Sequence, residues 1–551
     1  MAKKKQQEEV SFTLFQKVET YFESHPKLLI YLPLLIAFIF GILLFNLRLD
    51  EGGDDSAYIN RAADFIQDGK FPAFQGPIYP LFLASVITIF GIKLPLLKFT
   101  SLIFMLASIF FFTRALKGRV PHLVLFVSVI LLGINSYILN YASQTYSEAL
   151  FMMLQALFFW RFFRYFDKYS HKSDRIDKSE LIELLILGGL LFLVFQTRTI
   201  GAVLIISAAF IFLLKVKFKE LAIVLVTTIV LFGGIKVVEF TFQKNGAEPQ
   251  SQLSTLTYKH PYDLKEGKED FGGYLMRIVD NSNLYIGKQF LKIVGVKAAT
   301  NKEYSVVFTI VFYLVMGAGF WYIFRKNHEY LFLLVYAALA LLGTFVSIQK
   351  IWDQYRLIVP YVPIILLLLS LFIYTILSNK SFKELQITFL ILVASITVLV
   401  LGSSSKKFEV KNLVANLTTN KYQGYTPDWE NYLKLAEHAS NTLPSDSYIA
   451  VRKPDMARIY CNGKKFYGIF RFNSDNADEL VKQLKDAKVT HIILASLRKN
   501  PEVNSGDVIN TLHRYMTVII QKYPKAFTEL KSEGGTNEPA ALYKVNYENI
   551  N

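Results

Sequence analysis

Long apolar runs recur along the whole chain and are separated by short polar segments. Each run is close to the roughly 20 residues that an α-helix needs to cross the hydrocarbon core of a bilayer. The clearest runs are Leu28–Leu47, Val120–Leu139, Leu221–Phe240, Ser305–Phe324, Leu331–Ile348 and Leu357–Leu377. The pattern therefore predicts a polytopic α-helical membrane protein.

One apolar run, Ile78–Ile92, is too short for a full span. It follows Gly76 and Pro77 and has Pro80 in its first turn, and a span here would invert every later basic loop. We interpret it as a re-entrant or juxtamembrane helix on the outer face, so that Pro95–Phe112 is the second span. The hydropathy and charge rules then give about eleven spans.

Composition and charge add an orientation to this picture. The chain is 52% hydrophobic with a mean hydropathy of +0.32, and its net charge of +16 comes from basic residues clustered in short loops. This is the pattern of cytoplasmic loops and not of a nucleic-acid-binding surface. Lys3, Lys4 and Lys5 fix the N-terminus in the cytoplasm, and the first apolar run has no cleavage site of the kind that ends a signal peptide. The other basic clusters are Arg114-Lys117-Arg119, Arg161-Arg164-Lys168-Lys172-Arg175, Lys215-Lys217-Lys219, Arg325-Lys326 and Lys380-Lys383.

Three regions follow from this map: a cytoplasmic segment (1–27), a transmembrane domain (28–402, with outer loops 48–94 and 243–303) and a C-terminal outer-face domain (403–551). The second loop is long enough to be functional, and an amphipathic helix is expected at Tyr274–Leu291. The C-terminal domain has soluble composition and an alternating α/β pattern. Its expected helices and strands are Pro427–Asn441, Tyr448–Arg452, Ala477–Ala487, Val489–Ala495, Val508–Tyr523, Phe527–Leu530 and Ala541–Val545.

An acidic pair, Asp54 and Asp55, follows Gly52 and Gly53 just beyond the first apolar run. A carboxylate there could accept the proton of an attacking hydroxyl, and two together could hold a cation. The alternative is a solvated acidic turn that helps to mark the outer face. An amphipathic helix is expected to follow the pair at Tyr58–Gln67.

Three further charged residues fall at the predicted outer face. Glu148 at the mouth of a span is a functional candidate because a carboxylate at membrane depth is costly without a partner, although it could simply reach water. Arg198 and Arg356 suit phosphate contact, or they could extend to the lipid headgroups. Asp353 could also pair with Arg356, three residues later.

Motifs of several other enzyme classes are absent from the sequence. There is no H-E-x-x-H, C-x-x-C, G-x-S-x-G, G-x-G-x-x-G or Walker loop, so zinc, serine-hydrolase and nucleotide-binding chemistry are unsupported. The one cysteine, Cys461, is expected to be a small buried side chain.

Several short motifs, taken in order, resemble the GT-C superfamily of membrane glycosyltransferases, in the branch of the protein O-mannosyltransferases and the lipid A aminoarabinose transferase. The resemblance spans roughly Leu28–Leu377, and the α/β tail resembles the outer domain of several bacterial members. The second acidic position is often Glu in this branch, whereas here it is Asp. The motifs are Asp54-Asp55-Ser56-Ala57-Tyr58, Gly76-Pro77-Ile78-Tyr79-Pro80-Leu81-Phe82, Tyr146-Ser147-Glu148-Ala149-Leu150-Phe151, Thr197-Arg198-Thr199-Ile200-Gly201 and Tyr355-Arg356-Leu357-Ile358-Val359-Pro360.

The resemblance implies an inverting transferase that moves a sugar from a polyprenyl-phosphate donor to a hydroxyl of a glycolipid, glycan or protein, at the outer face of a bacterial inner membrane. Asp54 would be the general base, with Asp55 and Glu148 as further catalytic acidic groups. These three carboxylates could also hold Mg²⁺ or Mn²⁺. The residues that would bind substrate are Tyr58, Tyr79, Arg198, Tyr355 and Arg356. Of these, the two arginines would stabilise the leaving lipid phosphate.

Two other functions use the same membrane lipids. A transporter or flippase of lipid-linked glycans usually carries polar groups at mid-membrane in paired halves, and the sequence has no internal repeat. A surface-polysaccharide polymerase or ligase would be built around basic residues in a large loop, for which Gln243–Glu303 is long enough.

Overall fold

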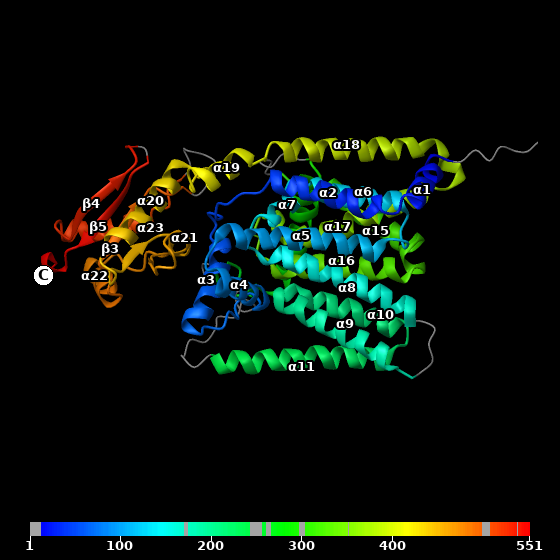
Figure 1. The fold of residues 1–551 in the computed structure, drawn as a ribbon, viewed down its shortest axis with the longest axis horizontal. Coiled ribbons are helices and arrows are strands. Elements are labelled where there is room, and N and C mark those ends of the chain that lie inside the picture. Colours follow the sequence, from blue (N-terminus) through cyan, green and yellow to red (C-terminus); the bar gives the residue numbers. More distant parts are fainter. Residues whose placement is uncertain are drawn as a thin grey trace, which may run out of the picture.

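The computed structural model describes residues 13–169, 175–242, 256–260, 266–296, 303–350, 352–498, 507–536 and 538–550. They form a helical bundle with an α/β domain at one end, which we call the domain end of the bundle (Figure 1). The predicted cytoplasmic residues Lys3, Lys4, Lys5 and Lys172, and the parts 243–255, 261–265 and 297–302 of the second outer loop, lie outside the described residues.

Seven helices in the described part of the chain are long and apolar enough to cross a membrane, counting their short terminal turns. They lie roughly side by side in Figure 1. Helices are expected here because lipid offers no hydrogen-bond partners, so each backbone N–H and C=O must be paired within its own segment. The seven are α5 (Leu94–Leu116), α9 (Lys178–Thr197), α11 (Phe218–Phe242), α15 (Val306–Tyr322), α16 (His328–Ser347), α17 (Val362–Leu377) and α18 (Gln386–Ser405).

If each of two bent helix pairs is counted as one span, the described residues contain nine candidate membrane spans. Helices α1 (Leu14–Ser24) and α2 (Leu28–Leu43) meet at 87°, and α6 (His122–Ile134) meets the segment Ser136–Ala142, which contains α7 (Ser136–Leu139), at 55°. At the second break Asn135 is extended and its side chain accepts hydrogen bonds from the first amides of α7, which is a standard N-cap.

Two more helices belong to the bundle by packing. Helix α8 (Ser147–Tyr169) packs against α5 and α9, and the shorter α10 (Ala202–Leu214) packs against α16. Helix α8 is less apolar because it carries Glu148, two arginines and the charged pair Asp167-Lys168. The described residues therefore contain seven to nine candidate spans, with α8 and α10 packed among them, where the sequence predicts about eleven.

The predicted juxtamembrane run is a short apolar helix, α4 (Ile78–Phe90), which packs on α3 (Asp54–Asp68) at the domain end. Helix α3 begins four residues before the predicted Tyr58. The cause is Gly53, whose φ of +98° lets the chain turn directly into the helix. Asp54 and Asp55 thus occupy its first turn, where the helix dipole favours negative charge.

The predicted amphipathic helix of the second loop begins at Phe271 as α13 (Phe271–Leu284). It continues through a π-helical segment (Tyr285–Phe290) and ends with α14 (Leu291–Ile293). Helix α13 packs against α16. This segment therefore belongs to the bundle wall rather than to a free loop.

The C-terminal domain is a five-stranded mixed sheet with strand order β2-β1-β3-β5-β4. β1 is parallel to β2 and β3, whereas β5 is antiparallel to β3 and β4. Every predicted element is present, and the sequence missed α19, α21 and β2. The elements are α19 (Val410–Thr418), α20 (Pro427–Thr442), β1 (Ile449–Val451), α21 (Pro454–Tyr460), β2 (Tyr467–Gly468), α22 (Ala477–Asp486), β3 (His491–Ala495), α23 (Thr511–Lys522), β4 (Phe527–Glu533) and β5 (Ala540–Val545).

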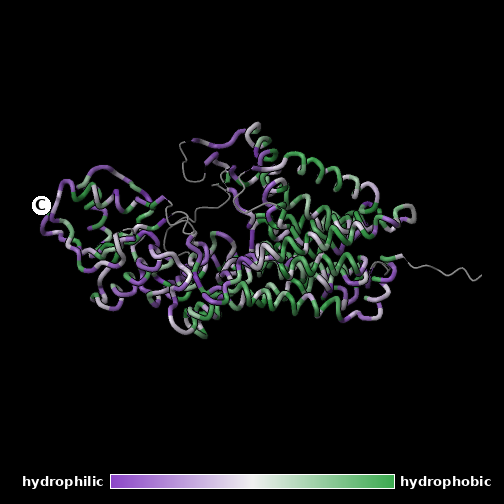
Figure 2. The backbone as a smooth tube through the Cα atoms, turned by 90° about the horizontal axis from the view of Figure 1, so that it is seen from above, coloured by the Kyte–Doolittle hydropathy of each residue, from purple (hydrophilic) through white to green (hydrophobic). Residues whose placement is uncertain are grey.

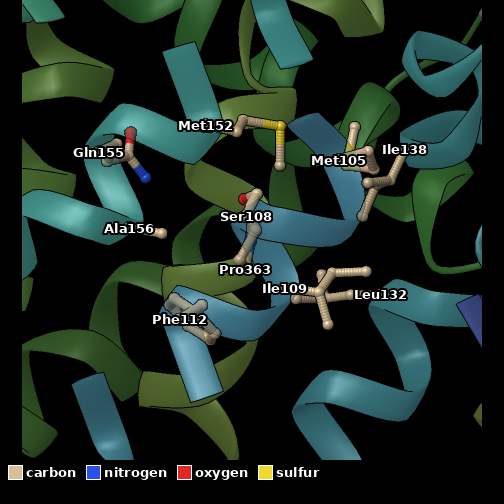
Figure 3. A pocket seen from close by; sticks show the side chains of 10 residues that line it. All are labelled: Met105, Ser108, Ile109, Phe112, Leu132, Ile138, Met152, Gln155, Ala156 and Pro363. Carbon is tan, nitrogen blue, oxygen red and sulfur yellow. The ribbon is translucent and has the colours of Figure 1, made fainter. Parts of the chain in front are cut away.

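Hydrophobic residues are concentrated in the bundle, and hydrophilic residues in the domain and at the ends of the bundle (Figure 2). Cys461 is buried in the domain, as expected. Inside the bundle, a cavity of about 10 Å³ lies between α5, α6, α8 and α17 (Figure 3). It has room for about one water molecule, so a substrate must bind elsewhere.

Candidate active site

Three of the predicted charged residues meet at the domain end of the bundle. Arg356, in the 3₁₀ turn Tyr355–Leu357, donates from Nη1 to Oδ2 of Asp54 and from Nε to Oε1 of Glu148. One guanidinium thus joins the first residue of α3 to the first turn of α8, which fits its planar fork of donors. The side chain of Asp54 is 49% exposed and that of Glu148 is 0% exposed.

Arg198 completes this cluster from the end of α9. Its Nη1 lies 2.5 Å from Oε1 of Glu148 and donates to Oγ of Ser147 at 3.3 Å. Gly76 packs against the backbone just before Arg198. A side chain could not fit there, since a Cβ at Gly76 would lie 2.5 Å from the carbonyl oxygen of Gln196. The glycine therefore lets the turn before α4 pack directly on the backbone that precedes Arg198.

Charge balance keeps this cluster ionised. Burial disfavours the charged form of Arg356, but Glu148 and Asp54 raise its pKa well above the usual range. Two arginines meet one fully buried carboxylate, and the second oxygen of Glu148, Oε2, has no hydrogen-bond partner among the described residues. A buried acceptor of this kind can take a hydrogen bond from a substrate.

Asp55 lies next to Asp54 in sequence but in a different environment. It is fully buried, its Oδ2 is 3.2 Å from Nζ of Lys98, and its Oδ1 accepts from the backbone N–H of Thr145 at 2.6 Å. Burial raises the pKa of Asp55, while Lys98 acts in the opposite direction. Its contacts are those of a side chain that fastens α3 to α5 and to the loop before α8.

The predicted tyrosines surround the cluster. Tyr58 and Tyr79 are both buried and pack edge to face at 5.3 Å between ring centroids, and the Tyr58 hydroxyl lies 3.1 Å from Oγ of Ser147. Tyr355 packs on Tyr137 at 5.0 Å. Asp353 forms its ion pair with Lys288 of the π-helical segment, so the alternative pairing of Asp353 with Arg356 was wrong.

The sequence reasoning missed several residues at the site. Lys98 is a lysine inside an apolar run, and that alone could have marked it. Tyr146 donates to Oδ2 of Asp50 at 2.6 Å and supports the Arg356 guanidinium on its ring at 4.2 Å. Lys292 lies 5.5 Å from the Tyr355 ring centre and adds positive charge beside the cluster. Tyr146 begins one of the motifs in the sequence but was given no role, and Lys292 has no distinguishing sequence pattern.

The three predicted metal ligands do not form a cation site. Asp55 is held by Lys98, and Arg356 lies between Asp54 and Glu148, where it supplies the charge that a cation would supply. In the described ranges no group of three or more His, Cys, Asp and Glu side chains could hold a metal ion. These residues as arranged do not fit Mg²⁺ or Mn²⁺.

No protein-family model matches the chain, and no curated protein matches it in sequence. Solved structures do match in fold. ArnT from Cupriavidus metallidurans bound to undecaprenyl phosphate superposes with a TM-score of 0.55 at 10% identity, over 94% of this chain and 98% of that chain.

The Archaeoglobus fulgidus oligosaccharyltransferase AglB, in complex with an inhibitory peptide and a dolichol-phosphate, has a TM-score of 0.52 at 11% identity, over 95% of this chain and 74% of that one. The A. fulgidus oligosaccharyltransferase with Zn and sulfate has a TM-score of 0.52 at 13% identity, over 84% and 67%. The chain therefore has the fold of the GT-C membrane glycosyltransferases.

Proposed function

We propose that the protein is a glycosyltransferase that moves a sugar from a polyprenyl-phosphate donor to an acceptor hydroxyl at the outer face of the membrane, with inversion. The observation that carries this is the bridge from Arg356 to Asp54 and Glu148. A half-exposed carboxylate, a buried carboxylate and two arginines meet at one end of a lipid-facing bundle. The lipids bound in the ArnT and AglB structures, undecaprenyl phosphate and dolichol-phosphate, support a polyprenyl-phosphate donor.

The reaction follows from the roles that these groups can take. The acceptor oxygen attacks the anomeric carbon while its proton passes to the carboxylate of Asp54. The bond between the anomeric carbon and the phosphate oxygen breaks, and the electron pair leaves with the lipid phosphate. Arg356 and Arg198 stabilise the negative charge that develops there, while Lys292 adds positive charge nearby. Attack opposite the leaving phosphate inverts the anomeric centre.

Glu148 keeps the two arginines apart and oriented. Because its Oε1 takes both guanidinium groups, its Oε2 is available to accept from a sugar hydroxyl. Tyr58 and Tyr79 form a buried wall behind Ser147 and stiffen the site. Asp55 acts through the backbone, because its contacts with Lys98 and Thr145 fix the first turn of α3.

The test uses membranes that contain the wild-type protein or Asp54→Asn, with labelled polyprenyl-phosphate sugars and a cell-envelope extract. Mass spectrometry follows label into new acceptors. Asp68→Asn is the matched control, because it removes a carboxylate from the other end of the same helix. We expect transfer with the wild type and the control and none with Asp54→Asn. Transfer by Asp54→Asn at the wild-type rate would refute the general base, and no transfer from any donor would refute the function.

A further inference from the structure

The turn before Asp54 is held from the membrane side by the bundle. The backbone N–H of Gly53 donates to the carbonyl of Asp50 at 3.0 Å and closes the turn. Tyr146 then fastens Asp50 through the hydrogen bond to its carboxylate. Between them, Gly52 and Gly53 have no side chains to resist rotation, so this segment needs further support to hold one conformation.

That support comes from the C-terminal domain. Lys453, the residue before α21, donates from Nζ to the carbonyl oxygen of Glu51 at 2.6 Å and to that of Gly52 at 3.4 Å. Burial lowers the pKa of Lys453, and its ammonium also lies 5.7 Å from the centre of the Trp429 ring. The ammonium of Lys453 therefore donates its hydrogen bonds to backbone carbonyls just before Asp54.

Helix α21 and the segment after it follow α3 along its length. Asn60 donates to the backbone carbonyl and to Oδ1 of Asp455 at 3.0 and 3.1 Å. Arg458 pairs with Asp64 at 2.7 Å. At the far end of α3, the exposed Lys465 pairs with Asp68 at 2.7 Å. The same interface thus has one lysine at the Asp54 end and another at the opposite end.

We propose that Lys453 is a positioning residue for Asp54, so that the C-terminal domain completes the active site by fixing the glycine turn from which the proposed general base projects. The inference rests on the proposed function of Asp54. Without Lys453, the carbonyls of Glu51 and Gly52 lose their donor and the turn can rotate. The Asp54 carboxylate then leaves its place beside Arg356, while the groups assigned to the donor phosphate stay where they are.

The kinetic consequence is specific. A misplacement of about 1 Å in a reacting group can cost about 100-fold in rate, so Lys453→Met is expected to lower kcat by about 10- to 100-fold. KM for the lipid donor should stay within about twofold, because the arginines that would bind the donor phosphate are unchanged in this variant. Lys453→Arg keeps donors for both carbonyls and should recover most of kcat. Lys465→Met, at the far end of the interface, should leave both constants within about twofold.

A second measurement does not depend on activity. Hydrogen–deuterium exchange of the full-length protein in detergent reports the amides of Gly53 and Ala57, which donate to Asp50 and Gly53. We expect the segment 50–57 to exchange at least about tenfold faster in Lys453→Met and unchanged in Lys465→Met. Thermal unfolding of each variant verifies that it is folded. If Lys453→Met is not, Lys453→Gln replaces it, because its shorter neutral side chain cannot reach both carbonyls.

The outcomes separate the two proposals. Unchanged exchange in a folded Lys453→Met protein, or an unchanged kcat, would overturn the positioning role. A rise in KM with kcat unchanged would overturn it too, since that is the sign of a binding contact. If the wild type transfers no sugar, the proposed function fails, and faster exchange in Lys453→Met would still support the control of the turn by Lys453.

Discussion

Replacing Asp55 by asparagine removes one charge of a buried ion pair and almost none of its volume. Oδ1 remains an acceptor for the backbone N–H of Thr145, so the change acts on the contact with Lys98. The new amide nitrogen can stand where Oδ2 stood, 3.2 Å from the ammonium, and two donors then face each other. Lys98 has a fully buried side chain and cannot reach water.

The loss of unfolding free energy depends on how many hydrogen-bond acceptors Lys98 retains. Breaking a buried pair by removing one partner costs about 3–5 kcal/mol. Lys98 retains the carbonyls of Arg48 and Ser143 and the side-chain oxygen of Gln144 as acceptors, so we expect the lower end, about 3 kcal/mol. In a chain of this length that corresponds to a fall in the thermal midpoint of about 2–3 °C. Asp54→Asn, half exposed, should shift it by about 1 °C or less.

Thermal unfolding of purified protein in one detergent, followed by intrinsic fluorescence, measures these shifts. The double variant Asp55→Asn/Lys98→Met removes the stranded charge as well and should recover at least half of the loss, because a buried pair can often be replaced by apolar groups. A midpoint for Asp55→Asn equal to that of the wild type would refute the reasoning. So would a double variant less stable than Asp55→Asn alone.

Other predictions concern the arginine bridge, pH and metal ions. Arg356→Lys should lower kcat by about 100-fold or more in the transfer assay, because one ammonium cannot replace the planar fork that joins Asp54 and Glu148; near-normal turnover would contradict this. Burial raises the pKa of Asp455, so the folded state binds that proton more tightly, and the stabilisation is lost as the pH rises through the folded pKa. Asp455→Asn, which keeps an acceptor for Asn60, should therefore raise the thermal midpoint near about pH 8 more than near about pH 4, and an equal shift at both would count against it. Because Arg356 supplies the charge between the carboxylates, EDTA should leave transfer above about half of its untreated rate, and a loss restored by Mg²⁺ would show that a cation takes part.

Much of the fold could be predicted from the sequence because lipid permits few alternatives. Apolar runs of helical length, punctuated by basic loops, correspond to the bundle even where Asn135 bends one span. The short run Ile78–Ile92 was correctly separated from the spans. Helix α21 escaped prediction because it is only 7 residues long and begins with Pro454, so it has no clear periodicity.

The site could be predicted only as a set of candidates. The sequence identified Asp54, Glu148, Arg198 and Arg356, but it could not predict how they pair. Arg356 contacts residues 208 and 302 positions earlier in the chain. The sequence made Asp54 the general base and gave Asp55 an assisting or cation-binding role, but it could not predict that Asp55 is buried against Lys98. Helical geometry turns neighbouring side chains about 100° apart, and the surroundings of each decide which one meets solvent. The catalytic assignments remain predictions.

The long reach of Arg356 has a consequence for biogenesis. Ribosomes add about 5–20 residues per second, so some 10–40 s separate the synthesis of Glu148 from that of Arg356, 208 residues later. During that interval Glu148 has Arg198 as its companion, and Asp54 has none of its final charge partners. The inserted N-terminal part must therefore keep this end open to water until the segment that carries Arg356 and α17 is made. A chain truncated before Arg356 would expose an incomplete polar cluster, which is a feature that membrane quality control can recognise.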